Sequence, residues 1–420
     1  MEYSLGFGKN SVNISLDEKY VLGVLKPQMI ERKKETHKLI NDALDNPIGS
    51  NKIEEIVKPG EKIVIITSDI TRPMPSYEVL PIIIERLIKK GIKTDDIKVI
   101  FALGSHRKHT RDEMIKLVGL DVFSKVECMD ADGSRCIHMG VTSYGTPVDI
   151  FEEVATADRR ICLGNIEYHY FAGYSGGAKA IMPGVSNRKA IQANHSKMTH
   201  SCAKTGELKK NPVRLDIEEA ISFIPIDFIL NVILNDKKQI IHSVAGHHIK
   251  AHRAGCKFLD SIYQCRLDEL GDIVIVSPGG YPKDINMYQA QKALDNAKHA
   301  VKNGGVIIWI ASCAEGFGEK VFERWIEEAT SPESMVKRIE KHFELGGHKA
   351  AAISMILEKC EVFMVTDLSD DTVKKAFIRP FDNINKALEA AREKMGSKAK
   401  IVLMPFGGST LPIHTKLKCK

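Results

Sequence analysis

Residues 68–73 form the first of four polar clusters in this 420-residue chain that follow an apolar run and carry side chains suited to chemistry. Asp69 and Thr71 are both good helix N-caps, and that structural role explains them without any function. It does not explain Arg72, because a positive charge is unfavourable at the positive end of a helix dipole. A guanidinium at this position is suited to bidentate binding of a carboxylate or a phosphate.

The second cluster, residues 104–110, reads GSHRKHT and contains His106. A single histidine at the end of a strand is usually just a surface residue. This one follows the apolar run 97–103, and we expect it at the same sheet edge as Arg72. An imidazole titrates near neutral pH, so His106 is a candidate general acid or base.

The third cluster, residues 165–184, is rich in glycine and aromatic residues around Lys179. A phosphate-binding P-loop needs glycine before the lysine and serine or threonine after it, whereas alanine flanks Lys179 on both sides. What remains is a backbone that can approach another group closely, with one lysine beside it. His195 follows as a candidate metal ligand or base. A glycine-rich loop with a solvated lysine is the simpler alternative.

The fourth cluster combines the loop 277–282 with the segment 287–292. On a helix, Tyr288 and Lys292 would lie one turn apart on one face, with Gln289 beside them. Such residues are common on helices, so this cluster indicates a ligand only in combination with the others.

Short β-branched runs alternate with helical segments, which predicts an α/β protein with mainly parallel sheets. One series of strands occupies residues 62–247 and ends in an expected pair, 227–235 with 239–247. A second series occupies residues 272–408. We therefore expect two domains, each with a mainly parallel sheet flanked by helices. Their predicted limits are 1–270, rejoined by the tail 406–420, and 271–405.

The composition is 43% hydrophobic and 27% charged with a formal net charge of +6, which is ordinary for a globular protein. Basic residues occur in short runs among acidic ones, so we expect no nucleic-acid partner. Nine cysteines without a C-x-x-C pair argue against a zinc ribbon or a disulfide scaffold. We see neither a signal-peptide pattern nor an apolar stretch long enough to cross a membrane, and expect a cytoplasmic protein without a membrane partner.

Taken together, the clusters resemble the nickel-pincer lactate racemase family, a group of 2-hydroxyacid racemases and epimerases. The resemblance rests on DITRP at 69–73, GSHR at 104–107, His169 ahead of Lys179 in FAGYSGGAK, NH at 194–195 and YQ-x-x-K at 288–292. Each motif is weak by itself. Their occurrence in this order, at family-like spacings along most of the chain, makes the resemblance specific.

The resemblance implies an isomerase with two α/β domains and a cofactor in the cleft between them. That cofactor is a nickel-pincer nucleotide, a pyridinium bisthiocarboxylic acid mononucleotide that carries Ni(II). By resemblance Lys179 binds it covalently, and His195 is the nickel ligand that the protein supplies. Cofactor-biosynthesis proteins would be partners, together with a small 2-hydroxyacid substrate.

The resemblance also implies roles for the other motif residues. Asp69, Thr71 and Arg72 would line the cofactor and substrate side of the first domain, with Arg72 meeting the cofactor phosphate or the substrate carboxylate. Substrate or cofactor would be bound from the second domain by Tyr288, Gln289 and Lys292. His106 and His169 would be the acid/base pair.

The chemistry of a 2-hydroxyacid agrees with such a cofactor. Its C2–H is far too weakly acidic to be removed by an imidazole, whose pKa is about 6.5. The hydroxyl proton is more accessible if C2–H leaves at the same time as hydride to an electrophilic cofactor. Racemisation then needs a base on each face of the planar keto intermediate, and His106 and His169 would supply the two.

The chain departs from the family pattern where lactate-specific members carry a tryptophan against the substrate methyl group. The corresponding segment, 346–353, has none, and Trp309 and Trp325 are the only tryptophans of the chain. We take lactate as the first choice of substrate. A larger or dicarboxylic hydroxyacid such as malate is the alternative, with His348 or Lys349 meeting the second carboxylate.

Two other classes of function stay open. In a pyridoxal-phosphate enzyme, Lys179 would form the Schiff base and Asp69 would contact the pyridinium nitrogen. Gly176 and Gly177 would then hold the phosphate, and the histidines would have no role. A non-catalytic carrier of the nickel cofactor would need no pair of bases.

Overall fold

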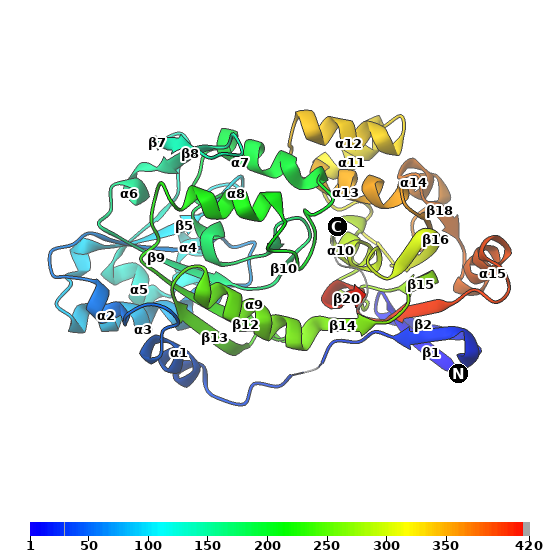
Figure 1. Ribbon diagram of the computed structural model, residues 1–420, viewed down its shortest axis with the longest axis horizontal. Helices are drawn as coiled ribbons and strands as arrows, with labels where there is room; N and C mark the ends of the chain where they lie inside the picture. The colour runs from blue at the N-terminus through cyan, green and yellow to red at the C-terminus, as the bar shows by residue number, and fades with distance from the viewer. Residues whose placement is uncertain (29, 415–420) are drawn as a thin grey trace. The chain divides into compact units, whose positions relative to one another are not determined.

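The computed structural model describes residues 1–28 and 30–414, which belong to two compact units. The central unit comprises residues 30–261, and the terminal unit combines residues 1–28 with residues 262–414. Each unit has its own mainly parallel sheet with helices around it (Figure 1). The predicted α/β class is therefore confirmed.

The sheet of the central unit has six strands in the order β13-β12-β9-β4-β5-β6. All are parallel except β13, which runs antiparallel to β12 at one edge. The strands are β4 (Ile63–Ser68), β5 (Ile97–Ala102), β6 (Glu127–Asp130), β9 (Arg159–Asn165), β12 (Phe228–Leu234) and β13 (Ile240–Gly246). Every residue of β12 is buried, which explains why this strand is a nearly continuous apolar run.

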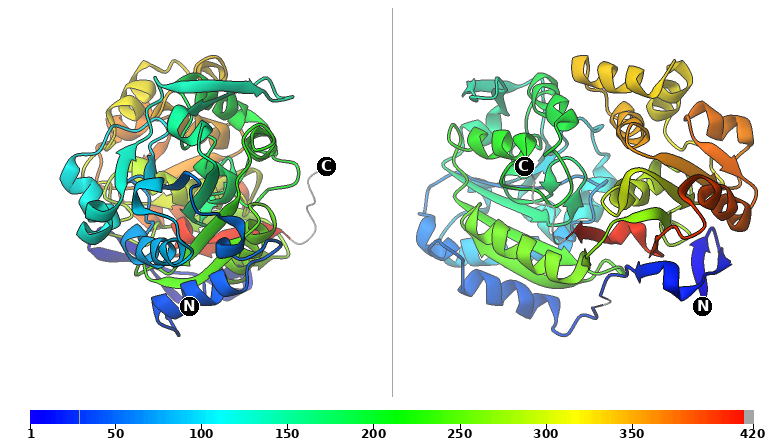
Figure 2. Two further views of the ribbon diagram at one scale, coloured as in Figure 1. Left: turned by 90° about the vertical axis from the view of Figure 1, so that its left-hand side faces the viewer. Right: turned by 45° about the vertical axis from the view of Figure 1, so that its right-hand side comes forward.

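Helices pack on the central sheet through apolar faces. Leu44 of α1 and Ile83 of α3 share one core with Ile65 of β4. Figure 2 shows α9 lying along β12 and β13, and Gly255 permits this approach because a side chain there would meet Val244. The helices are α1 (Thr36–Asp45), α2 (Ile53–Ile56), α3 (Ser76–Lys89), α4 (Arg111–Val118), α5 (Leu120–Lys125), α6 (Glu152–Ala155), α7 (Arg188–His195), α8 (Pro212–Ala220) and α9 (Lys250–Tyr263). Two short hairpins complete the unit: β7 (Cys136–Val141) with β8 (Pro147–Phe151), and β10 (Tyr168–His169) with β11 (Gly173–Tyr174).

The terminal unit has a six-stranded parallel sheet in the order β18-β17-β16-β15-β19-β3. Its strands are β3 (Val21–Val24), β15 (Gly271–Val276), β16 (Val301–Ile310), β17 (Glu361–Val365), β18 (Arg379–Phe381) and β19 (Ile401–Met404). Its helices are α10 (Met287–Ala297), α11 (Lys320–Glu328), α12 (Pro332–Lys341), α13 (Gly347–Leu357), α14 (Asp370–Lys375) and α15 (Ile384–Met395). Outside this sheet, β1 (Glu2–Phe7) pairs with β2 (Asn10–Ser15), and β14 (Gln264–Leu267) pairs with β20 (Leu411–His414).

The predicted division of the chain needs correction at both ends. The first 28 residues were expected in the first domain, but they belong to the terminal unit. The reason is that Val21 of β3 pairs with Ile401 of β19, and Leu5 lies in the same core as Ile273. The tail from 406 was expected to rejoin the first domain. Its described part instead stays in the terminal unit, where β20 pairs with β14, and residues 415–420 lie outside the described residues.

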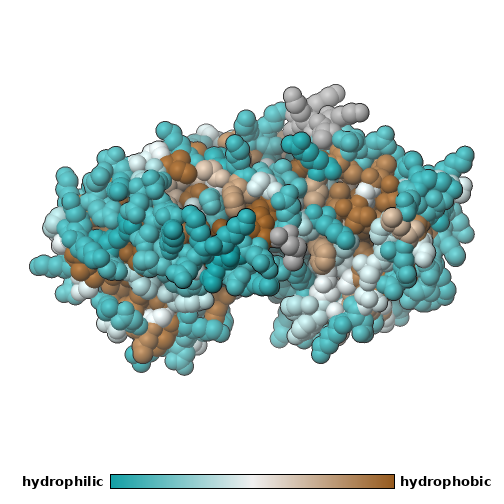
Figure 3. Space-filling view, turned by 90° about the horizontal axis from the view of Figure 1, so that it is seen from below, coloured by the Kyte–Doolittle hydropathy of each residue, from teal (hydrophilic) through white to brown (hydrophobic). Residues whose placement is uncertain are grey.

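The face of the molecule drawn in Figure 3 is mostly hydrophilic, with apolar side chains in small scattered groups. Within residues 1–28 and 30–414, no helix has both the length and the apolar composition needed to cross a membrane. The expectation of a cytoplasmic protein stays a prediction.

Candidate active site

Asp69 and His106 follow the carboxyl ends of two neighbouring parallel strands of the central sheet. Ser68 of β4 pairs with Ala102 of β5, so the residues after each strand emerge side by side. His106 Nδ1 lies 2.5 Å from Asp69 Oδ2. Thr71 Oγ1 donates to Asp69 Oδ1 at 2.8 Å and lies 3.4 Å from His106 Nδ1. The sequence-based expectation that these clusters meet at one sheet edge agrees with this geometry.

The Asp69 carboxyl is buried, with 2% of its surface exposed. Burial raises its pKa, but the hydrogen bonds with His106 and Thr71 and the charge of Arg72 outweigh that effect, so the pKa lies below its ordinary value. An ionised Asp69 accepts the Nδ1–H of His106 and thereby leaves the lone pair of the ring on Nε2. His106 thus presents the lone pair of its ring at Nε2.

A second histidine–aspartate pair holds the backbone beside the first. His109 Nδ1 lies 2.6 Å from Asp130 Oδ1, and the backbone N–H of His109 donates to Asp130 Oδ2 at 2.8 Å. The N–H of Ile70 donates to His109 Nε2 at 3.1 Å. His109 therefore ties the residue between Asp69 and Thr71 to the end of β6. Nothing in the sequence marks this contact of His109, although His109 is the second histidine of the GSHRKHT segment.

Glycines shape the loop that carries Lys179. Gly173, Gly176 and Gly177 have φ values of 77°, 74° and 58°, a region that other residues rarely adopt. The Gly177 N–H donates to Asn231 Oδ1 at 2.9 Å, and a side chain at Gly176 would meet that same amide. The sequence predicts that the backbone approaches another group closely at these glycines. In the structure that group belongs to the protein itself.

The side chain of Lys179 is half-buried. That burial, followed by the positive charges of Arg72 and Arg214, holds the pKa of Lys179 well below the ordinary lysine value, against a weaker opposing effect of Glu167. The neutral amine is thereby favoured, and a neutral amine is a nucleophile. A fully exposed lysine, the simpler alternative, would not be half-buried in this way.

His169, which precedes Lys179 in the sequence, contacts the aromatic rings of the two residues that follow it. Its ring stacks on Tyr170 at 5.6 Å between centroids and meets Phe171 edge-on at 4.5 Å. Burial is the largest cause that lowers its pKa well below the ordinary value, and the positive charge of Arg72 adds to it. The N–H of Ala172 donates to His169 Nδ1 at 3.2 Å, so the neutral ring carries its proton on Nε2.

His195 ends α7 on the other side of Phe171, whose ring meets it at 4.9 Å between centroids. Its Nδ1 lies 2.9 Å from Oδ1 of Asn194. That oxygen can only accept, so Nδ1 carries the proton and the lone pair is on Nε2. The three histidines expected to act together thus belong to one unit, although their roles stay predictions.

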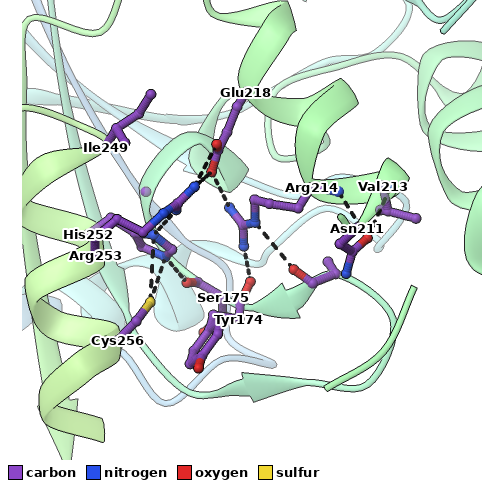
Figure 4. A network of polar contacts seen from close by, with 12 residues as sticks. Tyr174, Ser175, Asn211, Val213, Arg214, Glu218, Ile249, His252, Arg253 and Cys256 are labelled. Atoms are coloured by element: carbon purple, nitrogen blue, oxygen red, sulfur yellow. Dashed lines mark hydrogen bonds and ion pairs between the residues drawn. The ribbon is translucent and has the colours of Figure 1, made fainter. Parts of the chain in front are cut away.

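Side chains from α8 and α9 hold the backbone of the lysine loop (Figure 4). Arg214, with no exposed surface, donates from Nε to the Ala172 carbonyl at 3.2 Å and from Nη2 to the Tyr174 carbonyl. His252 Nε2 lies 2.8 Å from the Ser175 carbonyl, while its Nδ1 faces an Arg253 guanidinium nitrogen at 3.0 Å. No local motif marks Arg214, because its partners lie about 40 positions away in the chain.

The expected substrate-binding residues of the second domain lie at the start of α10 in the terminal unit. Tyr288 is half-buried, and Gln289 and Lys292 are exposed. The amine of Lys349 lies 3.9 Å from the centroid of the Tyr288 ring and donates to the Tyr288 carbonyl at 2.6 Å. His348 is buried, and its Nδ1 accepts the Gly346 N–H at 2.9 Å. Of the two residues considered for a second carboxylate, Lys349 is therefore the one beside a predicted substrate residue.

Both tryptophans are buried within the terminal unit. Trp325 packs against the start of α13, where a side chain at Gly347 would overlap its indole, and its Nε1 donates to Glu344 Oε2 at 2.7 Å. Trp309 lies in β16.

Comparison with known proteins identifies both halves of the chain. Residues 7–206 match the model of the lactate racemase N-terminal domain, and residues 268–411 match that of the lactate racemase C-terminal domain. The chain is 34% identical over 417 residues to a lactate racemase of Thermoanaerobacterium thermosaccharolyticum, covering 96% of this chain and 97% of that protein. It is 33% identical over 416 residues to a lactate racemase of Lactiplantibacillus plantarum, with the same coverage of 96% and 97%.

Solved structures of two proteins share the fold of this chain. The lactate racemase apoprotein from Thermoanaerobacterium thermosaccharolyticum superimposes with a TM-score of 0.89 at 33% identity, over 99% of this chain and 100% of that one. A protein from Thermotoga maritima shares the fold with a TM-score of 0.63 at 17% identity, over 92% of this chain and 100% of that one.

The α/β fold and these relatives place the chain among the isomerases, as a protein of the racemase type. It belongs to the lactate racemase family. The resemblance stated from the motifs is therefore confirmed, in preference to a pyridoxal-phosphate enzyme or a non-catalytic carrier. In the pyridoxal-phosphate alternative Asp69 would face a pyridinium nitrogen, whereas here its two oxygens contact Thr71 and His106.

Proposed function

We propose that the chain is a 2-hydroxyacid racemase that interconverts the enantiomers of lactate with a nickel-pincer nucleotide bound covalently to Lys179. Relatives named lactate racemase, aligned over 96% of the chain, support the substrate class. The observation that carries the proposal is the match to these relatives together with the place of Lys179, directly after Gly176 and Gly177 in a glycine loop of the central unit. Burial and two nearby arginines lower the pKa of its amine, which agrees with the proposal. A neutral amine is the form that bonds to an electrophilic carbon.

The residues around Lys179 fit such a cofactor. Asn165 Oδ1, at the carboxyl end of β9, is a buried acceptor with no hydrogen-bond partner in the described part of the chain. It can serve a polar group that the protein does not itself supply. His195 presents Nε2 as the nitrogen able to bind a metal. The described residues hold no group of three or more His, Cys, Asp or Glu arranged for a metal ion, so nickel at His195 would take its other ligands from the cofactor.

When bound, the cofactor supplies the hydride acceptor that the weakly acidic C2–H of the substrate requires. His106, oriented by Asp69, takes the hydroxyl proton at Nε2. Arg72 is exposed just beyond β4 and meets the substrate carboxylate or the cofactor phosphate. His169 serves the other face of the substrate. To act as a base at Nε2, His169 must carry its proton on Nδ1 instead, and this breaks the hydrogen bond that Nδ1 accepts from the Ala172 N–H.

The proposal assigns further substrate or cofactor contacts to the terminal unit, through Tyr288, Gln289 and Lys292. It also gives the protein transient partners, because the cofactor must be made and delivered by biosynthetic proteins.

The covalent assignment can be tested by intact mass, peptide mapping and nickel analysis of protein made in a host that produces the cofactor. We expect an adduct on Lys179 together with stoichiometric nickel. Lys179→Ala should give a folded protein without either. Lys189→Ala, which alters an exposed lysine of α7, is the matched control and should keep both. An unmodified Lys179 in a host that loads another family member would contradict the proposal.

A dicarboxylic hydroxyacid such as malate is a second candidate substrate, favoured by the cationic Lys349 beside Tyr288. A chiral assay of a hydroxyacid panel with the loaded enzyme compares the two. If malate is the substrate, Lys349→Met should lower kcat/KM for malate and leave lactate nearly unaffected. Racemisation of lactate alone would exclude the dicarboxylic alternative.

A further inference from the structure

A fully buried carboxylate, Asp216 on α8, lies behind the Asn194–His195 pair. Its Oδ1 accepts from Thr142 Oγ1 at 2.6 Å, and its Oδ2 accepts from Thr146 Oγ1 at 2.6 Å. Oδ2 also accepts from Asn194 Nδ2 at 2.8 Å. The amine of Lys197 lies 3.1 Å from the same oxygen. A buried charge is tolerated only with such complete compensation, so this set of contacts holds each member in one orientation.

Asn194 is the member that faces His195. Its Nδ2 donates to Asp216 Oδ2 at 2.8 Å and to the Val213 carbonyl at 3.2 Å, and both partners are acceptors only. The amide nitrogen must therefore point at Asp216, which leaves the amide oxygen for His195 Nδ1 at 2.9 Å. A flipped amide would place its nitrogen against His195 Nδ1 and its oxygen against a carboxylate.

We infer that Asp216 is a positioning residue: through Asn194 it fixes His195 in the tautomer with the proton on Nδ1, and so presents Nε2 as the metal-binding nitrogen. The inference rests on the proposed function in that it takes His195 as the nickel ligand. Neutral imidazoles bind metals through the nitrogen that lacks the proton, and the partner of the other nitrogen decides which one that is. Here that partner is an amide whose own orientation is set by a carboxylate.

The same contacts also join the turn between β7 and β8 to α7 and α8, so a purely structural role must be distinguished. The tautomer of His195 in the cofactor-free protein is a readout that simple stabilisation would not move. It can be read from the ¹⁵N spectrum of histidine-labelled full-length protein, with the His195 signals assigned by their loss in His195→Gln.

Four variants distinguish the positioning role of Asp216 from a purely structural role. Asp216→Leu removes the acceptor that orients Asn194, and we expect a mixture of His195 tautomers. Asp216→Asn should keep the wild-type tautomer, because the Lys197 ammonium selects an oxygen at the same place. Thr142→Val is the matched control, since it removes a hydrogen bond from the other oxygen of Asp216, and it should not change the tautomer. Asn194→Leu removes the acceptor of His195 directly and answers the question if Asp216→Leu does not fold.

Nickel release from the loaded protein provides the second readout. Loss of such an orienting contact typically weakens metal binding about 10- to 100-fold, and we expect Asp216→Leu and Asn194→Leu to release nickel faster by a factor of that order. A single, wild-type tautomer in folded Asp216→Leu, or in Asn194→Leu, would overturn the inference. A mixed tautomer with unchanged nickel retention would uphold the positioning role and would contradict His195 as the nickel ligand in the proposed function.

Discussion

His106 Nδ1 lies 2.5 Å from Asp69 Oδ2, although the two residues are 37 positions apart in the chain. They meet because β4 and β5 are parallel neighbours whose carboxyl ends lie at the same sheet edge. The buried, ionised Asp69 fixes the proton of His106 on Nδ1, and the base is thereby directed to Nε2. This pair is the structural basis for our proposal that His106 transfers a proton.

Asp69→Asn should lower kcat/KM for racemisation by about 10²- to 10⁴-fold, the usual contribution of one acid/base group. An amide can offer its nitrogen to His106 Nδ1 and so stabilise the wrong tautomer. Cofactor loading should persist, which nickel analysis can check. Asp132→Asn alters a carboxylate that contacts Lys108 and Ser134, and its activity should stay normal. Full activity of Asp69→Asn would exclude the pair from catalysis.

His109→Phe should reduce kcat while changing KM little. A flat aromatic ring is kept, but the Ile70 N–H loses its acceptor, so the backbone between Asp69 and Thr71 is released. An unsatisfied donor of this kind costs about 1–3 kcal/mol of folding free energy, measurable by urea unfolding. His138→Phe is the control, because His138 makes a similar contact with Asp149 from an exposed position. To show positioning rather than lost stability alone, the pH profile of kcat should also shift in His109→Phe.

Lys179→Met should stabilise the cofactor-free protein at neutral pH. The folded pKa of Lys179 lies below its unfolded value, so the unfolded chain binds an extra proton and the wild type is destabilised. That destabilisation decreases as pH rises toward the ordinary lysine pKa of about 10.4, where the unfolded chain also loses the proton. Urea unfolding across this range should therefore show a stability difference that shrinks with rising pH. Lys189→Met should show no such trend, and a flat difference for Lys179→Met would contradict the buried neutral amine.

Arg214→Met should loosen the loop that precedes Lys179. The Ala172 and Tyr174 carbonyls lose their charged donor, and the loss of one such hydrogen bond costs about 1.5–3 kcal/mol. Amide hydrogen exchange should accelerate at residues 173–179. Arg159→Met, which removes an arginine paired with Glu61 and Asp227 elsewhere in the same unit, should leave exchange in this loop unchanged. Equal protection of the loop in both variants would mean that Arg214 does not hold it.

The sequence predicted those parts of the site that depend on position along a strand. Asp69, Arg72 and His106 each follow an apolar run, and parallel strands bring such positions to one edge. The lysine loop was recognised from its glycines, but the partners that those glycines approach were not. Close packing between loops leaves no periodic pattern in the sequence.

Residues whose partners lie far away in the chain could not be predicted from the sequence. Arg214 and Asp216 are ordinary helix residues in the sequence, and only the folded chain brings them to the Ala172 carbonyl and to Asn194. The first 28 residues were misplaced for a similar reason. β3 has only four residues, and its partner β19 begins at Ile401, so nothing local indicates which sheet it joins.

Racemisation of L-lactate in D₂O by the loaded enzyme tests the central claim most directly. If C2–H leaves as hydride and returns to the other face, the D-lactate formed should retain protium at C2, which ¹H NMR and chiral analysis can establish together. His106→Ala should abolish the interconversion with cofactor still attached. Deuterium at C2 of the product, or no interconversion by protein with a modified Lys179, would contradict the account.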